Sequence, residues 1–258
     1  MNDYRRHAKI SMLEKPQLQD EKIMTGLREQ YGVPVTGLDF LPIGNDANAW
    51  VYRVRAADGE SYFLKVRQGA PAESALAVPR YLKDKGITQV IAPLPTLARE
   101  LWQSVDEFAL VLYPLITGKT GMEAGLSDPQ WIELGAILHK LHATKLTPPL
   151  ARLVKIETFS SRWSGIVKAL DSQIQTRAYK NGFEQDLATF WQAKREEIRK
   201  LVARTEELGR LLQKSTSEFV LCHADIHTAN VLLTSENQLF IVDWDEIIWA
   251  PKERDLRV

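Results

Sequence analysis

The chain has 258 residues, and its 33 Lys and Arg side chains balance its 33 Asp and Glu side chains, so the formal net charge is zero. A neutral chain argues against a nucleic-acid-binding scaffold and against recruitment to an anionic membrane surface. Hydrophobic residues make up 45% and charged residues 26% of the sequence, which excludes disorder as the dominant state. This length allows two modest lobes or one large domain.

Cys222 is the single cysteine of the sequence, so no intramolecular disulfide can form and a reducing, cytoplasmic setting is predicted. The first 17 residues contain no apolar stretch that could form the core of a signal peptide. The longest apolar run, 108–116, is about half of the ~20 residues that cross a bilayer. We therefore interpret that run as a buried strand and expect no membrane partner.

The first half of the chain is predicted to be rich in strands. Apolar spacing indicates a helix over 17–31, which Gly32 and Pro34 end. The turn signal Asp58-Gly59 joins two of three strands that form an antiparallel meander. The predicted elements are strands at 38–43, 50–55 and 62–66, a helix at 72–85 that contains Pro79, and a hairpin at 100–104 and 108–114.

The second half is predicted to be mostly helical. Ser127-Asp128-Pro129 supplies a cap and a first-turn proline for an amphipathic helix at 129–142. Helical patterns continue at 160–179 and 184–212, and short apolar strands follow at 219–222, 231–233 and 239–242. Two lobes are therefore expected, with a hinge at 113–118.

The densest group of polar residues is HADIHTAN at 223–230, followed thirteen residues after Asn230 by Asp243-Trp244-Asp245. Phosphoryl transfer requires a carboxylate beside the acceptor hydroxyl and oxygen ligands for Mg²⁺. Asp225 can supply that carboxylate, while Asn230 and Asp243 can supply hard oxygen ligands at the ends of adjacent strands. The two segments therefore match a kinase catalytic loop and its metal-binding partner.

These segments resemble the aminoglycoside phosphotransferase family, a branch of the protein-kinase-like fold with the patterns H-x-D-x-x-x-x-N and I-D-x-[DE]. The second pattern reads IVDWD at 241–245, with one extra residue after the isoleucine, so Asp243 is the anchor. CHADIHTANVLL, VDWDE and the downstream APKERDL are most similar to the spectinomycin phosphotransferase branch. The resemblance covers about residues 18–256.

The resemblance implies an α+β, two-lobed protein-kinase-like fold. Residues 1–114 would form an antiparallel-sheet N-lobe with a leading helix, and residues 115–258 a mostly helical C-lobe. Family members continue with further helices beyond the position of Leu256, so we expect an incomplete C-lobe that leaves the activity of this chain open.

The resemblance also implies roles for individual residues. Asp225 would act as the catalytic base, and Asn230 and Asp243 would bind Mg²⁺. Lys65 would contact the phosphates of ATP and form an ion pair with Glu73, which is placed by its order in the chain alone.

Further positions follow from the order of the elements. The connection between the first two strands would cover the phosphates with Gly44, Asn45, Asp46 and Asn48, although it has one glycine rather than the three of G-x-G-x-x-G. Adenine would lie at the hinge against Tyr113 and Leu115. This assignment rests on fold analogy.

Four further residues are assigned either a structural role or a role in acceptor binding. His223 is interpreted as a structural histidine and Asp255 as a carboxylate that holds the catalytic loop. Asp245 and Glu246 would favour a cationic acceptor.

For three other residues we prefer a structural role to a functional one. His139 and His142 lie three residues apart on a helix, where packing is a better explanation than a metal site without a third ligand. Cys222 is expected to be a buried, inert thiol.

The predicted function is ATP-dependent transfer of the γ-phosphate to a hydroxyl of a small cationic acceptor. The acceptor would be an aminocyclitol or aminoglycoside antibiotic such as spectinomycin. Phosphorylation of the antibiotic would confer resistance. Three alternatives stay open: a kinase of a metabolite of the choline, homoserine or methylthioribose type, a truncated nucleotide-binding protein without transfer activity, and a zinc hydrolase that uses His223, Asp225 and His227.

Overall fold

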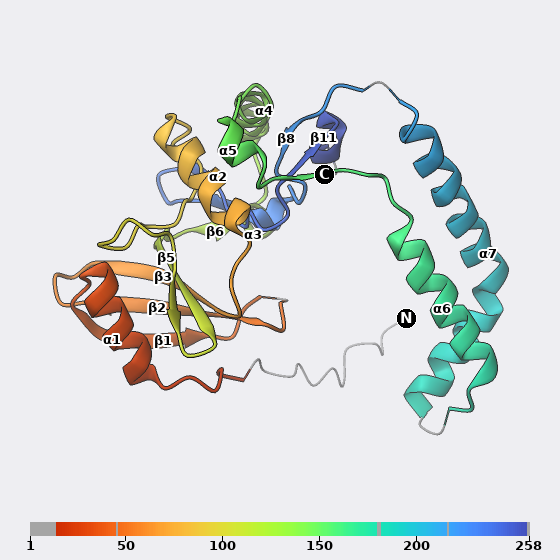
Figure 1. Ribbon diagram of the computed structural model, residues 1–258, viewed down its shortest axis with the longest axis horizontal. Coiled ribbons are helices and arrows are strands. Elements are labelled where there is room, and N and C mark those ends of the chain that lie inside the picture. Colours follow the sequence, from red (N-terminus) through yellow and green to blue (C-terminus); the bar gives the residue numbers. More distant parts are fainter. Residues whose placement is uncertain (1–13, 45, 180–181, 216, 257–258) are drawn as a thin grey trace. The chain divides into compact units, whose positions relative to one another are not determined.

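The computed structural model describes residues 14–44, 46–179, 182–215 and 217–256 and is shown in Figure 1. Its helices are α1 (Asp20–Tyr31), α2 (Glu73–Asp84), α3 (Gly121–Ala124), α4 (Asp128–His142), α5 (Pro148–Ala151), α6 (Arg162–Thr176) and α7 (Gly182–Leu212). Its strands are β1 (Val35–Leu41), β2 (Ala49–Ala56), β3 (Ser61–Gln68), β4 (Gln103–Val105), β5 (Phe108–Pro114), β6 (Lys119–Thr120), β7 (Lys155–Ile156), β8 (Val220–Cys222), β9 (Val231–Leu233), β10 (Leu239–Ile241) and β11 (Ile248–Ala250). The 3₁₀ helices η1 (Thr228–Asn230) and η2 (Lys252–Asp255) flank the last strands.

A five-stranded antiparallel sheet in the order β1-β2-β3-β5-β4 forms the N-terminal part (Figure 1). The turn between β2 and β3 contains Gly59 at φ +88°, and the carboxylate of Asp58 accepts the N–H of Glu60 at 3.0 Å. Both features fit a tight hairpin turn, because glycine adopts positive φ without a steric penalty. The predicted meander is confirmed, and β5 and β4 extend it at the β3 edge.

Alternation along β3 decides which side chains reach the site. Leu64 and Val66 are fully buried in the core that Ile23 and Leu27 of α1 share with the sheet. Successive side chains of a strand point to opposite faces, so Lys65 lies on the face away from α1, together with Phe63 and Arg67. One face of the sheet therefore packs a core, and the other carries two cations.

Helix α2 is continuous through Pro79. Proline removes one backbone hydrogen bond from a helix interior, but this face of α2 is buried. Pro79 and its neighbours Val78 and Leu82 are buried, and the last two belong to the second core cluster. Burial of that apolar face offsets the local defect.

The second core cluster joins α2 and α4 to the short strands that flank the polar motifs. Leu134 and Leu138 of α4 pack with Leu221 of β8, Val231 of β9 and Ile241 of β10. Strand β9 pairs with β10, and β8 pairs with β11, both antiparallel. The polar motifs thus begin and end on strands that are fixed in a core.

Several boundaries differ from the predictions. The predicted strand 100–104 is instead β4 at Gln103–Val105, and β1 starts at Val35, which is buried, rather than at residue 38. The helix predicted at 129–142 is confirmed as α4, with a reciprocal Ser127–Gln130 capping box. The short elements α3, α5, β6, β7 and β11 were not predicted, because two to four residues carry no periodic signal.

The chain divides into two compact units, one made of residues up to Lys155 together with those from Val220, the other of Ile156–Phe219. The second unit consists of α6 and α7, held together around Asp171, whose carboxylate accepts hydrogen bonds from Trp191 and Arg195. The lobe boundary at residues 114 and 115 remains a prediction. Within the described residues, no helix is both long enough and apolar enough to span a lipid bilayer.

Candidate active site

Asp225, in the loop after β8, contacts Asn230, the last residue of η1. The Asn230 Nδ2 group donates to the backbone carbonyl of Asp225 at 2.9 Å and lies 3.2 Å from its Oδ2 atom. Asn230 is 8% exposed, whereas about half of the Asp225 side chain is exposed. The amide nitrogen of Asn230 is therefore used inside the loop, which leaves its oxygen as the atom available to a ligand.

His223 braces this loop through both ring nitrogens. Its Nδ1 accepts the N–H of Asp225 at 3.3 Å, so Nε2 carries the proton and donates to the carbonyl of Val242 at 3.0 Å. Burial lowers the pKa of His223, which favours this neutral tautomer. The ring also packs against Trp244, with centroids 4.6 Å apart. The predicted structural role of His223 agrees with these contacts.

Asp255 holds the backbone at the start of the same loop. Its carboxylate accepts the N–H groups of His223 at 3.1 Å and Ala224 at 2.7 Å. The Asp255 side chain is fully buried and also lies 2.9 Å from His142 Nε2. The arrangement matches the predicted support role of Asp255, and it gives the buried charge three polar partners.

Asp243 is brought to the loop by its neighbour Val242, which bonds to both His223 and Asn230: the N–H of Val242 donates to the Asn230 carbonyl at 3.1 Å. Asp243 itself has a φ of +63°, a conformation that Asp tolerates better than most residues. Burial raises its pKa, Lys65 opposes that shift, and Asp245 and Asp225 add to it. Asp225, Asn230 and Asp243 are thus joined by a short chain of contacts.

Lys65 approaches the acidic segment from β3. Its Nζ atom lies 2.6 Å from Asp245 Oδ2 and 4.0 Å from Asp243 Oδ1. The predicted Lys65–Glu73 pair is not formed: among the described residues, the ion pairs of Lys65 are those with the two aspartates, and Glu73 is exposed at the start of α2. Lys65 thus pairs with the carboxylates that follow β10 rather than with the one at the start of α2.

Asp245 was predicted to face the acceptor, yet the structure pairs it with Lys65. Glu246, the other residue predicted to attract a cation, is exposed. Neither position contradicts a contact with an acceptor, and both roles remain predictions.

The connection between β1 and β2 lies beside β3. The N–H of Asn48 donates to Asp46 Oδ1 at 2.9 Å, and the carbonyl of Asn48 accepts the N–H of Gln68 at 2.9 Å. Gly44 has a φ of +105°, which a glycine adopts freely. Asn45, the fourth residue predicted here, lies outside the described residues. Arg67 was not predicted as a site residue. Its position two residues after Lys65 on β3 places both side chains on the same face of the sheet.

Tyr113 and Leu115 lie at the end of β5, where adenine is predicted to bind. The β3–β5 ladder ends at the Tyr62–Pro114 pair, so the backbone of Leu115 lies beyond the ladder. Burial raises the pKa of Tyr113, and the ring packs against Phe63 with centroids 6.3 Å apart. This segment offers backbone groups beside partly buried apolar side chains, as a planar base requires.

The donor set fits a magnesium nucleotide. Asn230 and Asp243 offer an amide and a carboxylate oxygen, which Mg²⁺ prefers to the nitrogen and sulfur ligands of zinc. Lys65 adjoins Asp243 and provides a cation for phosphate oxygens.

The zinc alternative does not fit these contacts. Both ring nitrogens of His223 are used within the fold, by the N–H of Asp225 and by the carbonyl of Val242. Among the described residues, the group of three whose ligand atoms lie within 4.8 Å of one another is instead His142, Cys222 and Asp255.

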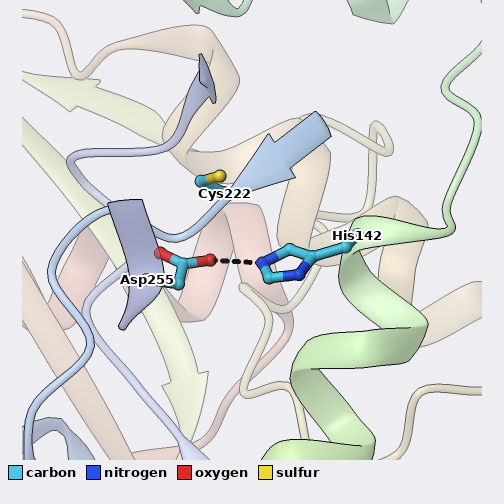
Figure 2. A group of neighbouring side chains, drawn as sticks. All are labelled: His142, Cys222 and Asp255. Carbon is cyan, nitrogen blue, oxygen red and sulfur yellow. Dashed lines mark hydrogen bonds and ion pairs between the residues drawn. The ribbon is translucent and has the colours of Figure 1, made fainter. Parts of the chain in front are cut away.

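That second group is better explained as a brace than as a metal site. Figure 2 shows His142 and Asp255 pointing toward each other, with the Cys222 thiol beside them. Both Asp255 oxygens already accept backbone N–H groups, and burial raises the pKa of Cys222 to about 12, which disfavours the thiolate that a metal needs. The predicted inert thiol and the predicted packing role of His142 are consistent with this arrangement.

The chain is similar to a known protein family and to several of its members. The model of the phosphotransferase enzyme family matches residues 39–256. The curated protein StrN of Streptomyces griseus is 28% identical in an alignment of 233 residues that covers 85% of this chain and 68% of StrN. The solved spectinomycin phosphotransferase in complex with ADP and spectinomycin is 32% identical, with a TM-score of 0.85 over 93% of this chain and 73% of that one.

A more distant structure agrees in fold. An amicoumacin kinase in complex with AMP-PNP is 16% identical with a TM-score of 0.60, over 93% of this chain and 67% of that one. The predicted α+β, kinase-like fold is confirmed by these matches and by the antiparallel sheet that carries Lys65. Since the family match spans the sheet, the catalytic loop and the acidic segment after β10, the chain belongs to the phosphotransferase enzyme family and is a kinase of the aminoglycoside phosphotransferase type.

Proposed function

We propose that this protein transfers the γ-phosphate of MgATP to a hydroxyl of a small cationic acceptor, most closely an aminocyclitol such as spectinomycin. The observation that carries the proposal is one connected cluster of charged groups from two distant parts of the sequence. Lys65 of β3 contacts Asp243 and Asp245 after β10.

Each residue of the cluster has a distinct task in this proposal. Asp225 orients the acceptor hydroxyl and takes its proton at a carboxylate oxygen as the bond from that hydroxyl oxygen to the γ-phosphorus forms and the bond from the γ-phosphorus to the ADP oxygen breaks, so that ADP leaves. Asn230 and Asp243 hold Mg²⁺, which supplies charge neutralisation at the phosphates when it is bound. Lys65 exchanges its aspartate partners for phosphate oxygens, and the segment after β5 receives the adenine.

The acceptor class rests on two supports. The relative at 32% identity was solved in complex with ADP and spectinomycin. In this chain, Glu246 directly follows Asp245 and Glu253 lies two residues before Asp255; both are exposed and favour a cation over an anion. The predicted lobe boundary at residue 114 and a cytoplasmic location, where ATP is available, belong to the same proposal.

A coupled ADP-release assay with MgATP and a panel of acceptors tests this function. The panel contains spectinomycin, streptomycin, choline, homoserine and methylthioribose, and Asp225→Asn is the inactive reference. Acceptor-dependent ADP release with spectinomycin supports the proposal. Release with choline or another metabolite alone overturns the acceptor class.

Thermal unfolding with and without MgATP separates transfer from binding. Stabilisation by the nucleotide with no ADP release from any acceptor would favour the binding-only alternative. No stabilisation and no release would overturn the proposal as a whole.

A further inference from the structure

Arg67 bridges two segments that are about 200 residues apart in the chain. One of its guanidinium nitrogens lies 3.6 Å from Asp46 Oδ2, in the β1–β2 connection, and 3.6 Å from Asp245 Oδ2, after β10. Among the described residues, no other cationic side chain pairs with carboxylates of both segments. Arg67 is thus the electrostatic link between them.

The Asp46 end of this link is built rather than incidental. Asp46 uses Oδ1 to accept the N–H of Asn48 and directs Oδ2 to Arg67. The carbonyl of Asn48 accepts the N–H of Gln68, the residue after Arg67. Backbone and side-chain contacts therefore fix the connection against the end of β3.

The Asp245 end is shared with the lysine of the site. Asp245 Oδ2 lies 2.6 Å from Lys65 and 3.6 Å from Arg67. Lys65 and Arg67 are two residues apart on one strand, so both side chains lie on the same face of the sheet. A triphosphate that draws Lys65 away from Asp245 is therefore also attracted electrostatically by the Arg67 guanidinium.

We propose that Arg67 is a second phosphate-binding cation, which contacts the nucleoside triphosphate together with Lys65. Its guanidinium fork can contact phosphate oxygens with one edge while the pair with Asp46 keeps the β1–β2 connection beside them. It also neutralises Asp46 and Asp245, two carboxylates that would otherwise repel the phosphates. This inference rests on the proposed function, because it requires a nucleotide at the site.

Nucleotide titrations of Arg67→Gln test the proposal without an acceptor. Calorimetric dissociation constants are measured for MgATP and for AMP, with the full chain. We expect Arg67→Gln to weaken MgATP about tenfold or more, as for a lost charge-assisted bond, and AMP by less than about twofold. In steady-state assays, KM for MgATP should rise more than kcat falls.

Two further variants make the outcome specific. Arg55→Gln removes another cation of the same sheet, one that pairs with Asp39 at 3.1 Å, and should keep both affinities. Arg67→Lys keeps the charge without the fork and should lie between wild type and Arg67→Gln, which gives a readout even if Arg67→Gln does not fold.

If wild type binds MgATP and Arg67→Gln keeps the wild-type ratio of MgATP to AMP affinity, the proposed role of Arg67 is wrong while the proposed function stands. If Arg67→Gln does not fold, the same comparison is made with Arg67→Lys. Absence of nucleotide binding by the wild-type chain overturns the proposed function as well.

Discussion

The carboxylate of Asp255 accepts the N–H of Ala224 at 2.7 Å, and Ala224 has a φ of +70°. A left-handed conformation costs a non-glycine residue roughly 1–2 kcal/mol. The buried carboxylate holds the backbone in that conformation just before Asp225. A strained residue is thus stabilised from a second segment of the chain, as is usual where a loop must present a reactive side chain.

Replacement of Asp255 with Asn should release this loop. The substitution removes the charge and turns an N–H₂ group toward backbone donors, which should lower the free energy of unfolding by about 2–4 kcal/mol. Urea unfolding measures the loss. Glu253→Gln, an exposed change in the same 3₁₀ helix η2, is the matched control, and equal stability of the two variants would contradict the structural role of Asp255.

Replacement of Ala224 with Gly should be tolerated. Glycine relieves the cost of positive φ, and its greater freedom in the unfolded chain offsets that gain, so the net change should stay within about 0.5 kcal/mol. Ala229→Gly, at a negative φ in η1, should destabilise by roughly 0.5–1 kcal/mol. Ala224→Val should destabilise by more than about 2 kcal/mol, because a branched side chain resists this conformation. Thermal or urea unfolding of the three variants checks the order.

Asp225→Asn and Asp243→Ala should separate transfer from nucleotide binding. Loss of the Asp225 carboxylate should lower kcat by about 10²–10⁴-fold and leave MgATP affinity nearly intact, because the base acts in the transition state. Asp243→Ala should weaken MgATP binding and raise the Mg²⁺ concentration needed for half-maximal binding. Glu236→Gln, exposed in the turn between β9 and β10, should change neither quantity. A large loss of MgATP affinity in Asp225→Asn would contradict the division of roles.

The α6–α7 unit should lose stability in acid through Asp171. Hydrogen bonds from Arg195 hold the pKa of Asp171 below its usual value of 3.8, with help from Trp191 and Arg199. Since the folded pKa is lower than the unfolded one, the stabilisation is complete above the unfolded pKa and disappears as the pH falls through the folded pKa. Helicity measured by circular dichroism in urea, from neutral pH to about pH 3, should show a steeper acid loss for wild type than for Asp171→Asn.

Asp186→Asn is the control for this pH dependence, because Asp186 is an exposed carboxylate of α7. It should keep the wild-type profile. Identical profiles for wild type and Asp171→Asn would show that this cluster does not contribute to stability.

The sequence alone predicted the strands around the site and its candidate residues. The three strand segments and the Asp58-Gly59 turn predicted the meander, because short strand-forming runs and a turn dipeptide are local signals. The spacing from Asp225 to Asn230 and Asp243 predicted one site, because Asp225 and Asp243 each come after a short apolar strand and Asn230 directly precedes one.

Only the tertiary structure decided which charges meet. Lys65 pairs with Asp243 and Asp245 rather than with Glu73, and Arg67 links Asp46 to Asp245. Each of these choices depends on the distance between atoms that lie far apart in the chain. Local periodicity carries no information about such distances, whereas the packed sheet and the short strands fix them.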